Sequence, residues 1–279
     1  MAVRRLSVAL TLLCGFAAGI PASPAEDRAI VLASTTATQA SGLLDYLLPI
    51  FTAKTGIEVT VIARRADEVL DGARKGEADV VLMHARPQEE KFVADGFGTK
   101  RFDVMYNDYV LIGPKSDPAR VKGKDIATAL KAIESKGVPF VTRGDRSGTH
   151  AAELALWIVA GIDIASVKGA WYHEAGHGQG MTAALDAAHA ANAYVLSDRG
   201  SWIGFRDRGD LDIVVEGDKR LLNQYGVMLV NPEKYPNVKR ELGQAFIDWL
   251  ISPEGQGAIA GYKVDGQQVF FPNADKSGG

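Results

Sequence analysis

The chain of 279 residues carries 31 Lys and Arg against 34 Asp and Glu, which gives a formal net charge of −3. This weakly acidic balance argues against nucleic acid or an anionic membrane surface as the partner, although local N–H dipoles can still bind a small anion. The length is sufficient for one or two domains, each with its own core.

The first 25 residues have the pattern of a secretory signal peptide. A basic start at Arg4 and Arg5 precedes an apolar run over 6–20, and Ser23-Pro24-Ala25 supplies the small residues of a cleavage site. We expect cleavage after Ala25 and a periplasmic location. Loss of the two arginines lowers the formal charge by two, from −3 to −5.

The single cysteine, Cys14, lies inside this segment. The mature chain therefore has no disulfide, thiolate metal site or cysteine nucleophile. A lipid anchor on Cys14 is the alternative to simple cleavage, and it is disfavoured because Leu13 is bulky where a lipoprotein signal has a small residue.

Strand-like and helix-like runs alternate along the rest of the chain. A buried strand over 29–33 and a hydroxyl-rich loop over 34–38 lead into an amphipathic helix that ends at Gly56. Further strands are predicted over 57–62, 79–83, 138–141, 170–173 and 193–196, and further helices over 66–75, 87–94, 124–135, 149–160 and 181–191. This alternation is typical of an α/β fold with mainly parallel sheets flanked by helices.

Two extended apolar segments that end in a proline turn, 109–115 and 225–234, resemble each other. If both cross between two lobes, lobe 1 is discontinuous and covers 26–110 and 222–279, and lobe 2 covers 111–221. Two connecting strands form a hinge, which a ligand held between the lobes would close. A pair of ordinary edge strands is the alternative interpretation.

Hydroxyl-bearing residues follow two of the predicted strands where a helix begins. One helix N-terminus is approached by Ser34, Thr35 and Thr36, and the other by Arg143, Ser147, Gly148 and Thr149. Helix N-termini favour anions because their first N–H groups are unpaired and lie at the positive end of the macrodipole. An arginine adds forked, charge-assisted hydrogen bonds. Facing each other, the two loops would enclose one small anion, whereas the alternative is a capped helix beside a surface arginine.

Five groups of residues occur along the chain in a characteristic order: Ser34-Thr35-Thr36-Ala37-Thr38 with Ser41-Gly42-Leu43-Leu44-Asp45, Gly76-Glu77-Ala78-Asp79-Val80-Val81-Leu82-Met83-His84-Ala85, Met105-Tyr106-Asn107-Asp108-Tyr109, Arg143-Gly144-Asp145 with Ser147-Gly148-Thr149-His150, and Ser197-Asp198-Arg199-Gly200. Together they resemble the tungstate-binding proteins of bacterial ABC importers, which have the two-lobed type II periplasmic binding protein fold. The resemblance covers nearly the whole mature chain.

The resemblance implies that a tungstate or molybdate ion sits between the lobes. Its ligands would be Ser34, Thr35 and Thr36 on one side and Arg143, Ser147, Gly148 and Thr149 on the other. It also implies a monomeric receptor without cofactor or metal that delivers the ion to a permease and its ATPase. The chain departs from the family pattern at Ala37, where a fourth hydroxyl is expected, and at Thr182, where a glycine is expected. Whether Ala37 and the 176–182 loop contact the ligand stays open.

Phosphate is the second candidate ligand. Tungstate and molybdate are unprotonated dianions at neutral pH, so their ideal site offers donors and no carboxylate. Phosphate-binding proteins of the same fold carry a similar Arg-x-Asp-x-Ser-Gly-Thr segment and need a carboxylate to accept the phosphate proton. Asp145 is the candidate acceptor, but we expect it to orient Arg143 instead.

His173, Glu174 and His177 have the spacing of a zinc-protease motif. That chemistry needs both histidines on one face of a regular helix and a third ligand. Glycines at 176, 178 and 180 break such a helix, so a zinc metalloprotease is a distant alternative. We expect His84 and His189 to be ordinary polar residues at element ends, and we predict a binding protein and not an enzyme.

Overall fold

The computed structural model describes residues 28–175 and 180–274. The predicted signal segment 1–25, Cys14 included, lies outside them. Within the described ranges, no helix is both long enough and apolar enough to cross a membrane.

The first part of the chain forms the predicted alternation of strands and helices. Gly56 ends α2 in the left-handed conformation, with φ of 66°, and donates its N–H to the Thr52 carbonyl. The predicted loop over 34–38 is wrong, because the strand continues to Thr35, whose side chain then caps a short helix that begins at Thr36. The elements are β1 Ala29–Thr35, α1 Thr36–Ala40, α2 Leu43–Thr55, β2 Glu58–Arg64, α3 Ala66–Ala73, β3 Val80–Met83 and α4 Arg86–Ala94.

The second part adds elements that the sequence pattern did not predict, namely the first half of β4, the helices α7, α9, α10 and α11, and the strands β8, β10, β11 and β12. The elements are β4 Gly98–Pro114, α5 Ile126–Lys136, β5 Phe140–Thr142, α6 Gly148–Val159, α7 Ile164–Val167, β6 Tyr172–Glu174, α8 Gly180–Ala191, β7 Tyr194–Asp198, α9 Arg199–Gly204, β8 Leu211–Val215, the 3-10 turn Lys219–Leu221, β9 Leu222–Val230, α10 Arg240–Ile251, α11 Pro253–Gly261, β10 Lys263–Val264, β11 Gln267–Gln268 and β12 Phe271–Pro272.

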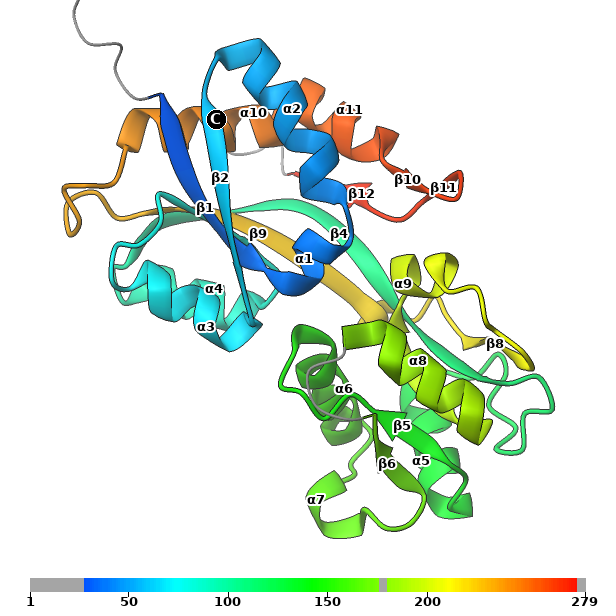
Figure 1. The fold of residues 1–279 in the computed structure, drawn as a ribbon. Coiled ribbons are helices and arrows are strands. Elements are labelled where there is room, and N and C mark those ends of the chain that lie inside the picture. The colour runs from blue at the N-terminus through cyan, green and yellow to red at the C-terminus, as the bar shows by residue number, and fades with distance from the viewer. Residues whose placement is uncertain (1–27, 176–179, 275–279) are drawn as a thin grey trace, which may run out of the picture.

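Two long antiparallel strands, β4 and β9, join two groups of parallel strands (Figure 1). The strand order is β2-β1-β3-β9-β4-β7-β5-β6, with β1 parallel to β2 and β3 at one end and β5 parallel to β6 and β7 at the other. The β4–β9 pairing ends at Asp108 and Leu222, after which Tyr109 pairs with Asp198 of β7. The mixed sheets with flanking helices confirm the predicted α/β class.

The apolar core is divided in the same way. One buried cluster, which includes Leu32, Phe51 and Phe246, draws on residues 30–105 and 203–270. Two others, around Trp157 and Leu185, draw only on residues 109–221. The predicted division into lobes 26–110 with 222–279 and 111–221 stays a proposal that these separate cores support. Ile203 of α9 is a residue of the 111–221 range that packs in the first cluster.

Candidate functional site

A cleft of about 1510 Å³ lies between the two groups of strands. The N-termini of five helices, α1, α3, α6, α8 and α9, open onto it, and each presents the positive end of a helix dipole. Its volume far exceeds that of a tetrahedral oxyanion, so a single ion would occupy only part of it. The lining includes Thr35, Thr36, Ala37 and Arg65 on one side, residues 143–148 with Gly180, Met181 and Thr182 on the other, and Asn107 and Asp198 from β4 and the end of β7.

Arg143 is fixed at the cleft by Asp145. Asp145 Oδ2 accepts from Arg143 Nε at 3.0 Å and also from Nη2, while Oδ1 accepts from the Ser147 N–H at 3.0 Å. Both charged side chains are 11% exposed. Burial raises the pKa of Asp145, but the hydrogen bonds from Ser147 and Arg143 outweigh it and hold that pKa below its usual range. The expected role of Asp145 in orienting Arg143 agrees with this geometry.

The start of α6 combines capping with a close approach across the cleft. Ser147 is the N-cap, and its Oγ accepts from the His150 N–H at 3.3 Å. Gly148 lines the cleft, whereas Thr149 is buried and does not. Ser147 and Gly148 can therefore contact a ligand directly, and Thr149 lies behind them.

On the opposite wall, the three predicted ligands have three different positions. Ser34 is fully buried and its Oγ donates to the Leu82 carbonyl at 2.8 Å, so its hydroxyl does not face the cleft. Thr35 lines the cleft as the N-cap of α1, with its Oγ1 accepting from the Thr38 N–H at 3.1 Å. Thr36 and Ala37 are exposed on the cleft wall, where the first N–H groups of a helix have no intrahelical acceptor.

Polar residues that the sequence did not single out as ligands form a hydrogen-bond chain behind Thr35. His84 Nε2 lies 3.2 Å from Thr35 Oγ1, His84 Nδ1 lies 3.2 Å from Asn223 Oδ1, and Asn223 Nδ2 donates to Asn107 Oδ1 at 2.7 Å. His84 lies at an element end, between β3 and α4, as expected, and its two ring nitrogens both take part in this chain. Asn107 belongs to one of the five residue groups on which the family resemblance rests, and this membership could have marked it as a candidate site residue.

The groups behind the cleft wall are uncharged at neutral pH. Burial lowers the pKa of His84, and burial raises the pKa values of the Tyr109 and Tyr225 phenols well above their usual range. The ring of Tyr225 packs on that of His84, with centroids 4.8 Å apart. Arg143, paired with Asp145, is thus a charged donor beside neutral ones, and Arg65 and Arg146 also line the cleft.

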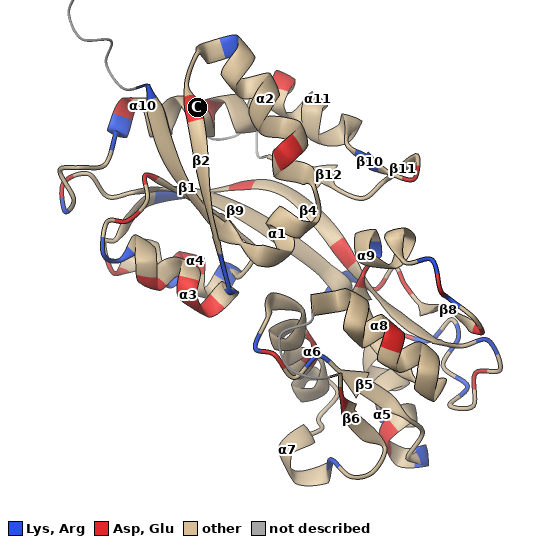
Figure 2. Cartoon of the chain, in the orientation of Figure 1, with Lys and Arg blue, Asp and Glu red and all other residues tan. Residues whose placement is uncertain are grey.

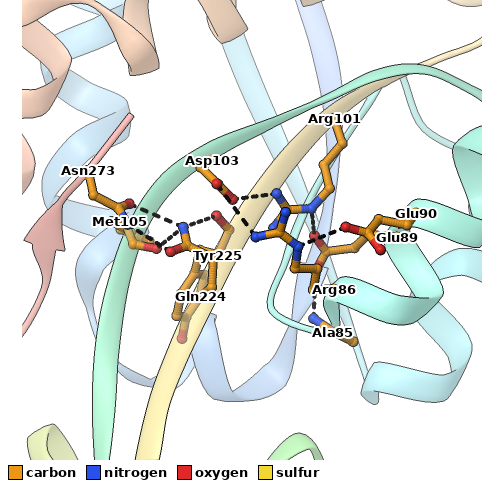
Figure 3. A network of polar contacts seen from close by, with 10 residues as sticks. All are labelled: Ala85, Arg86, Glu89, Glu90, Arg101, Asp103, Met105, Gln224, Tyr225 and Asn273. Atoms are coloured by element: carbon orange, nitrogen blue, oxygen red, sulfur yellow. Dashed lines mark hydrogen bonds and ion pairs between the residues drawn. The ribbon is translucent and has the colours of Figure 1, made fainter. Parts of the chain in front are cut away.

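A buried ion pair holds the turn that carries His84 (Figure 3). Glu89 Oε1 accepts from the Ala85 N–H at 2.5 Å, and its Oε2 accepts from Arg101 Nε at 2.7 Å. The pair lies over Gly226 of β9, where any side chain would collide with it. Burial raises the pKa of Glu89 against the opposing effect of Arg101. Through Glu89, the turn that contains His84 is thus attached to Arg101 of β4.

The carboxylates beside the cleft are largely engaged by the protein. Asp198 caps α9, with its Oδ1 accepting from the Ser201 N–H at 2.8 Å and its Oδ2 from the Ser201 hydroxyl at 2.6 Å. Asp145 is held as described above, and Asp207 at the rim is 82% exposed. Basic and acidic positions lie near each other at the end of β2 and on the loop before α6 (Figure 2). Asp145 and Asp198, the two carboxylates of the cleft lining that are not exposed, thus both already accept hydrogen bonds from the protein.

The zinc-protease alternative is contradicted at the residues that can be placed. His173 and Glu174 lie in strand β6, not in a helix, and both are exposed. His177 lies outside the described residues. Within the described part of the chain, no three His, Cys, Asp or Glu side chains are grouped as metal ligands.

Residues 22–254 match the model of the PBP superfamily domain. The tungstate-binding protein TupA of Peptoclostridium acidaminophilum is 46% identical over 252 residues, which cover 88% of this chain and 86% of that protein. The chain belongs to the TupA family. Two solved structures are also similar: TupA of Desulfovibrio alaskensis G20, with 42% identity, a TM-score of 0.81 and coverage of 88% and 99% of the two chains, and the tungstate ABC transporter protein of Geobacter sulfurreducens, with 48% identity, a TM-score of 0.73 and coverage of 84% and 98%.

Membership of the TupA family confirms the predicted type II periplasmic binding protein fold. The relatives named above are binding proteins of transporters and not enzymes.

Proposed function

We propose that this protein captures tungstate in the cleft, with molybdate as a second ligand, and presents it to an ABC importer. One observation carries the proposal: the cleft offers donors from both walls, while Asp145 and Asp198 are engaged by Arg143, Ser147 and Ser201. An unprotonated dianion needs donors and no acceptor. The O–H group of a protonated phosphate would instead have to share Asp145 or Asp198 with the protein donors that these carboxylates already bind.

Capture would proceed from one wall to the other. The anion would first meet the N–H groups of Thr36 and Ala37 and the Thr36 hydroxyl, and approach of the other wall would then bring Arg143 and Ser147 to it. Because closure removes water, the charge-assisted hydrogen bonds of Arg143 become stronger. The bent path of β4 and β9 between the two cores is the hinge for this movement.

The same proposal extends to location and partners. The signal-like segment 1–25, with its expected cleavage after Ala25, supports a periplasmic receptor. A permease and its ATPase are the partners that such a receptor serves. The receptor itself acts as a monomer, has no catalytic activity and needs no cofactor.

Calorimetric titration of residues 26–279 with tungstate in a phosphate-free buffer tests the proposal. We expect saturable binding at one ion per chain, displacement by molybdate and no displacement by phosphate. Phosphate binding without tungstate binding would make the protein a phosphate receptor, with Asp145 or Asp198 as proton acceptor. Binding of neither ion would refute the assignment of an oxyanion cleft.

A further inference from the structure

His84 lies where the two walls of the cleft meet, in the turn between β3 and α4. Its partly buried ring is packed on Tyr225 and hydrogen-bonded to Thr35 of the first wall. From the second wall, Gly148 comes so close that a β-carbon on it would lie 2.6 Å from His84 Cε1. The imidazole is therefore the side chain that connects the two anion-binding helix starts.

The hydrogen-bond chain assigns the ring protons. Asn223 offers Oδ1 to His84 Nδ1, because its Nδ2 donates to Asn107 Oδ1. An oxygen accepts, so Nδ1 carries the proton and the neutral ring has an acceptor at Nε2. Nε2 accepts a hydrogen bond from the Thr35 hydroxyl, whose oxygen already accepts from the Thr38 N–H. In this state Thr35 has no proton left for a ligand.

This arrangement conflicts with binding of a dianion at Thr35. A second ring proton removes the conflict, because Nε2–H would donate to Thr35 Oγ1 and the Thr35 hydroxyl would turn to the cleft. The Thr38 N–H and the imidazolium Nε2–H would then occupy both acceptor positions of Thr35 Oγ1, so the Thr38 hydroxyl, 2.8 Å away, would turn to another acceptor. Thr35 would thus accept two hydrogen bonds and donate one to the anion.

The charges around His84 favour neutrality without ligand and protonation with it. Burial lowers the pKa of His84, and Asp198, at the end of β7, opposes this effect. The phenols of Tyr109 on β4 and Tyr225 on β9 are neutral, Glu89 on α4 is paired with Arg101, and Arg143 on the opposite wall is paired with Asp145. A dianion in the cleft adds nearby negative charge, which stabilises an imidazolium.

We propose that His84 takes up a proton when the cleft captures a dianion, and that this proton frees the Thr35 hydroxyl to donate to the anion. The inference rests on the proposed function and adds a coupling between capture and pH. Between the titration of the free and of the bound protein, Kd should rise about tenfold for each unit of increasing pH, as linkage requires for one proton.

Calorimetry of tungstate binding near neutral pH, in two phosphate-free buffers of different ionisation heat, tests the coupling. We expect about one proton taken from the buffer per ion bound, as linkage for a single titrating group requires. The His84→Gln variant should bind more weakly, with no proton uptake and a flat pH profile. His173→Gln, which changes an exposed histidine of β6, is the matched control and should behave as the wild type does.

Two results separate this inference from the proposed function. Tungstate binding without proton uptake would overturn the role of His84 and leave the receptor assignment standing, whereas absence of tungstate binding would refute the assignment itself. If His84→Gln does not fold, the imidazole nitrogen resonances of the wild type decide. Both ring nitrogens should be protonated with tungstate bound, and a ring that stays neutral would overturn the inference.

Discussion

Gly148 and His84 come into contact from opposite walls of the cleft, and the absence of a side chain at Gly148 makes that contact possible. Gly148 is the first residue of α6, and its φ is not in the left-handed region, so backbone conformation does not require glycine there. The requirement is space across the cleft. This contact is therefore a direct way to test whether approach of the walls matters for binding.

Replacing Gly148 by alanine should weaken tungstate binding without unfolding α6. The new methyl group would collide with His84 and keep the walls apart, at a cost of about 1–3 kcal/mol as for other overpacked contacts. Calorimetric Kd and the free energy of unfolding, measured together, check this. Gly257→Ala in α11 is the matched control, because nothing lies within 4 Å of a β-carbon there. Equal affinity of the two variants would show that the contact has no part in binding.

Arg143→Ala should weaken tungstate binding by about 3–5 kcal/mol, the range for breaking a buried ion pair. The anion loses its forked donor, and Asp145 is left as an unpaired carboxylate that repels it. Arg143→Lys should lose less, because the charge remains and only the fork is removed.

A second substitution separates these two causes. Adding Asp145→Asn to Arg143→Ala removes the repulsion and should recover part of the affinity, as titration of the single and double variants would reveal. No recovery would mean that Asp145 does not act on the ligand, and near-wild-type affinity of Arg143→Ala would remove the arginine from the site.

Ser34 and Thr35 are neighbours in sequence, but loss of the hydroxyl should lower the tungstate affinity only at Thr35. Ser34→Ala removes the hydrogen bond to Leu82 and should lower the free energy of unfolding by about 1 kcal/mol with affinity kept. Thr35→Val removes the cap of α1 and should lower the affinity as well. Urea unfolding and tungstate titration of both variants check this. A loss of affinity in Ser34→Ala equal to that in Thr35→Val would return Ser34 to the ligand shell.

Glu153 should make stability depend on pH. Burial raises its pKa to about 7, although Tyr172 and Trp157 donate hydrogen bonds to it. The folded protein thus holds a proton that the unfolded chain releases near its ordinary pKa of about 4.3. The free energy of unfolding should fall by roughly 3 kcal/mol as pH rises from that value to about 7.

The Glu153→Gln variant keeps an acceptor for both donors and should lack this dependence. Urea unfolding of both proteins across the same pH range provides the comparison. A constant difference between them would show that Glu153 does not titrate in this range.

The alternation of apolar runs was sufficient to predict most elements, but the first half of β4 was missed. Its residues Lys100, Arg101 and Asp103 make the segment look like a polar loop. In the strand, Arg101 forms an ion pair with the buried Glu89, twelve residues earlier on α4, and Gly226 leaves space for the pair. The segment is thus held in the sheet by its pairing with β9 and by an ion pair that no local pattern indicates.

At the site, the sequence predicted the two loops but not the depth of each side chain. Successive strand residues point to opposite faces, so Ser34 at the end of β1 turns away when Thr35 faces the cleft. The chain through His84, Asn223 and Asn107 joins residues 139 and 116 positions apart. No local pattern indicates such pairs, and only the crossing of β4 and β9 brings them together.

Diffraction from crystals grown with tungstate, using the anomalous scattering of tungsten, tests the central claim most directly. We predict one strong anomalous peak in the cleft, within hydrogen-bonding distance of the Arg143 guanidinium on one side and of the Thr36 and Ala37 N–H groups on the other. A peak away from these groups, or none in the cleft, would contradict the account.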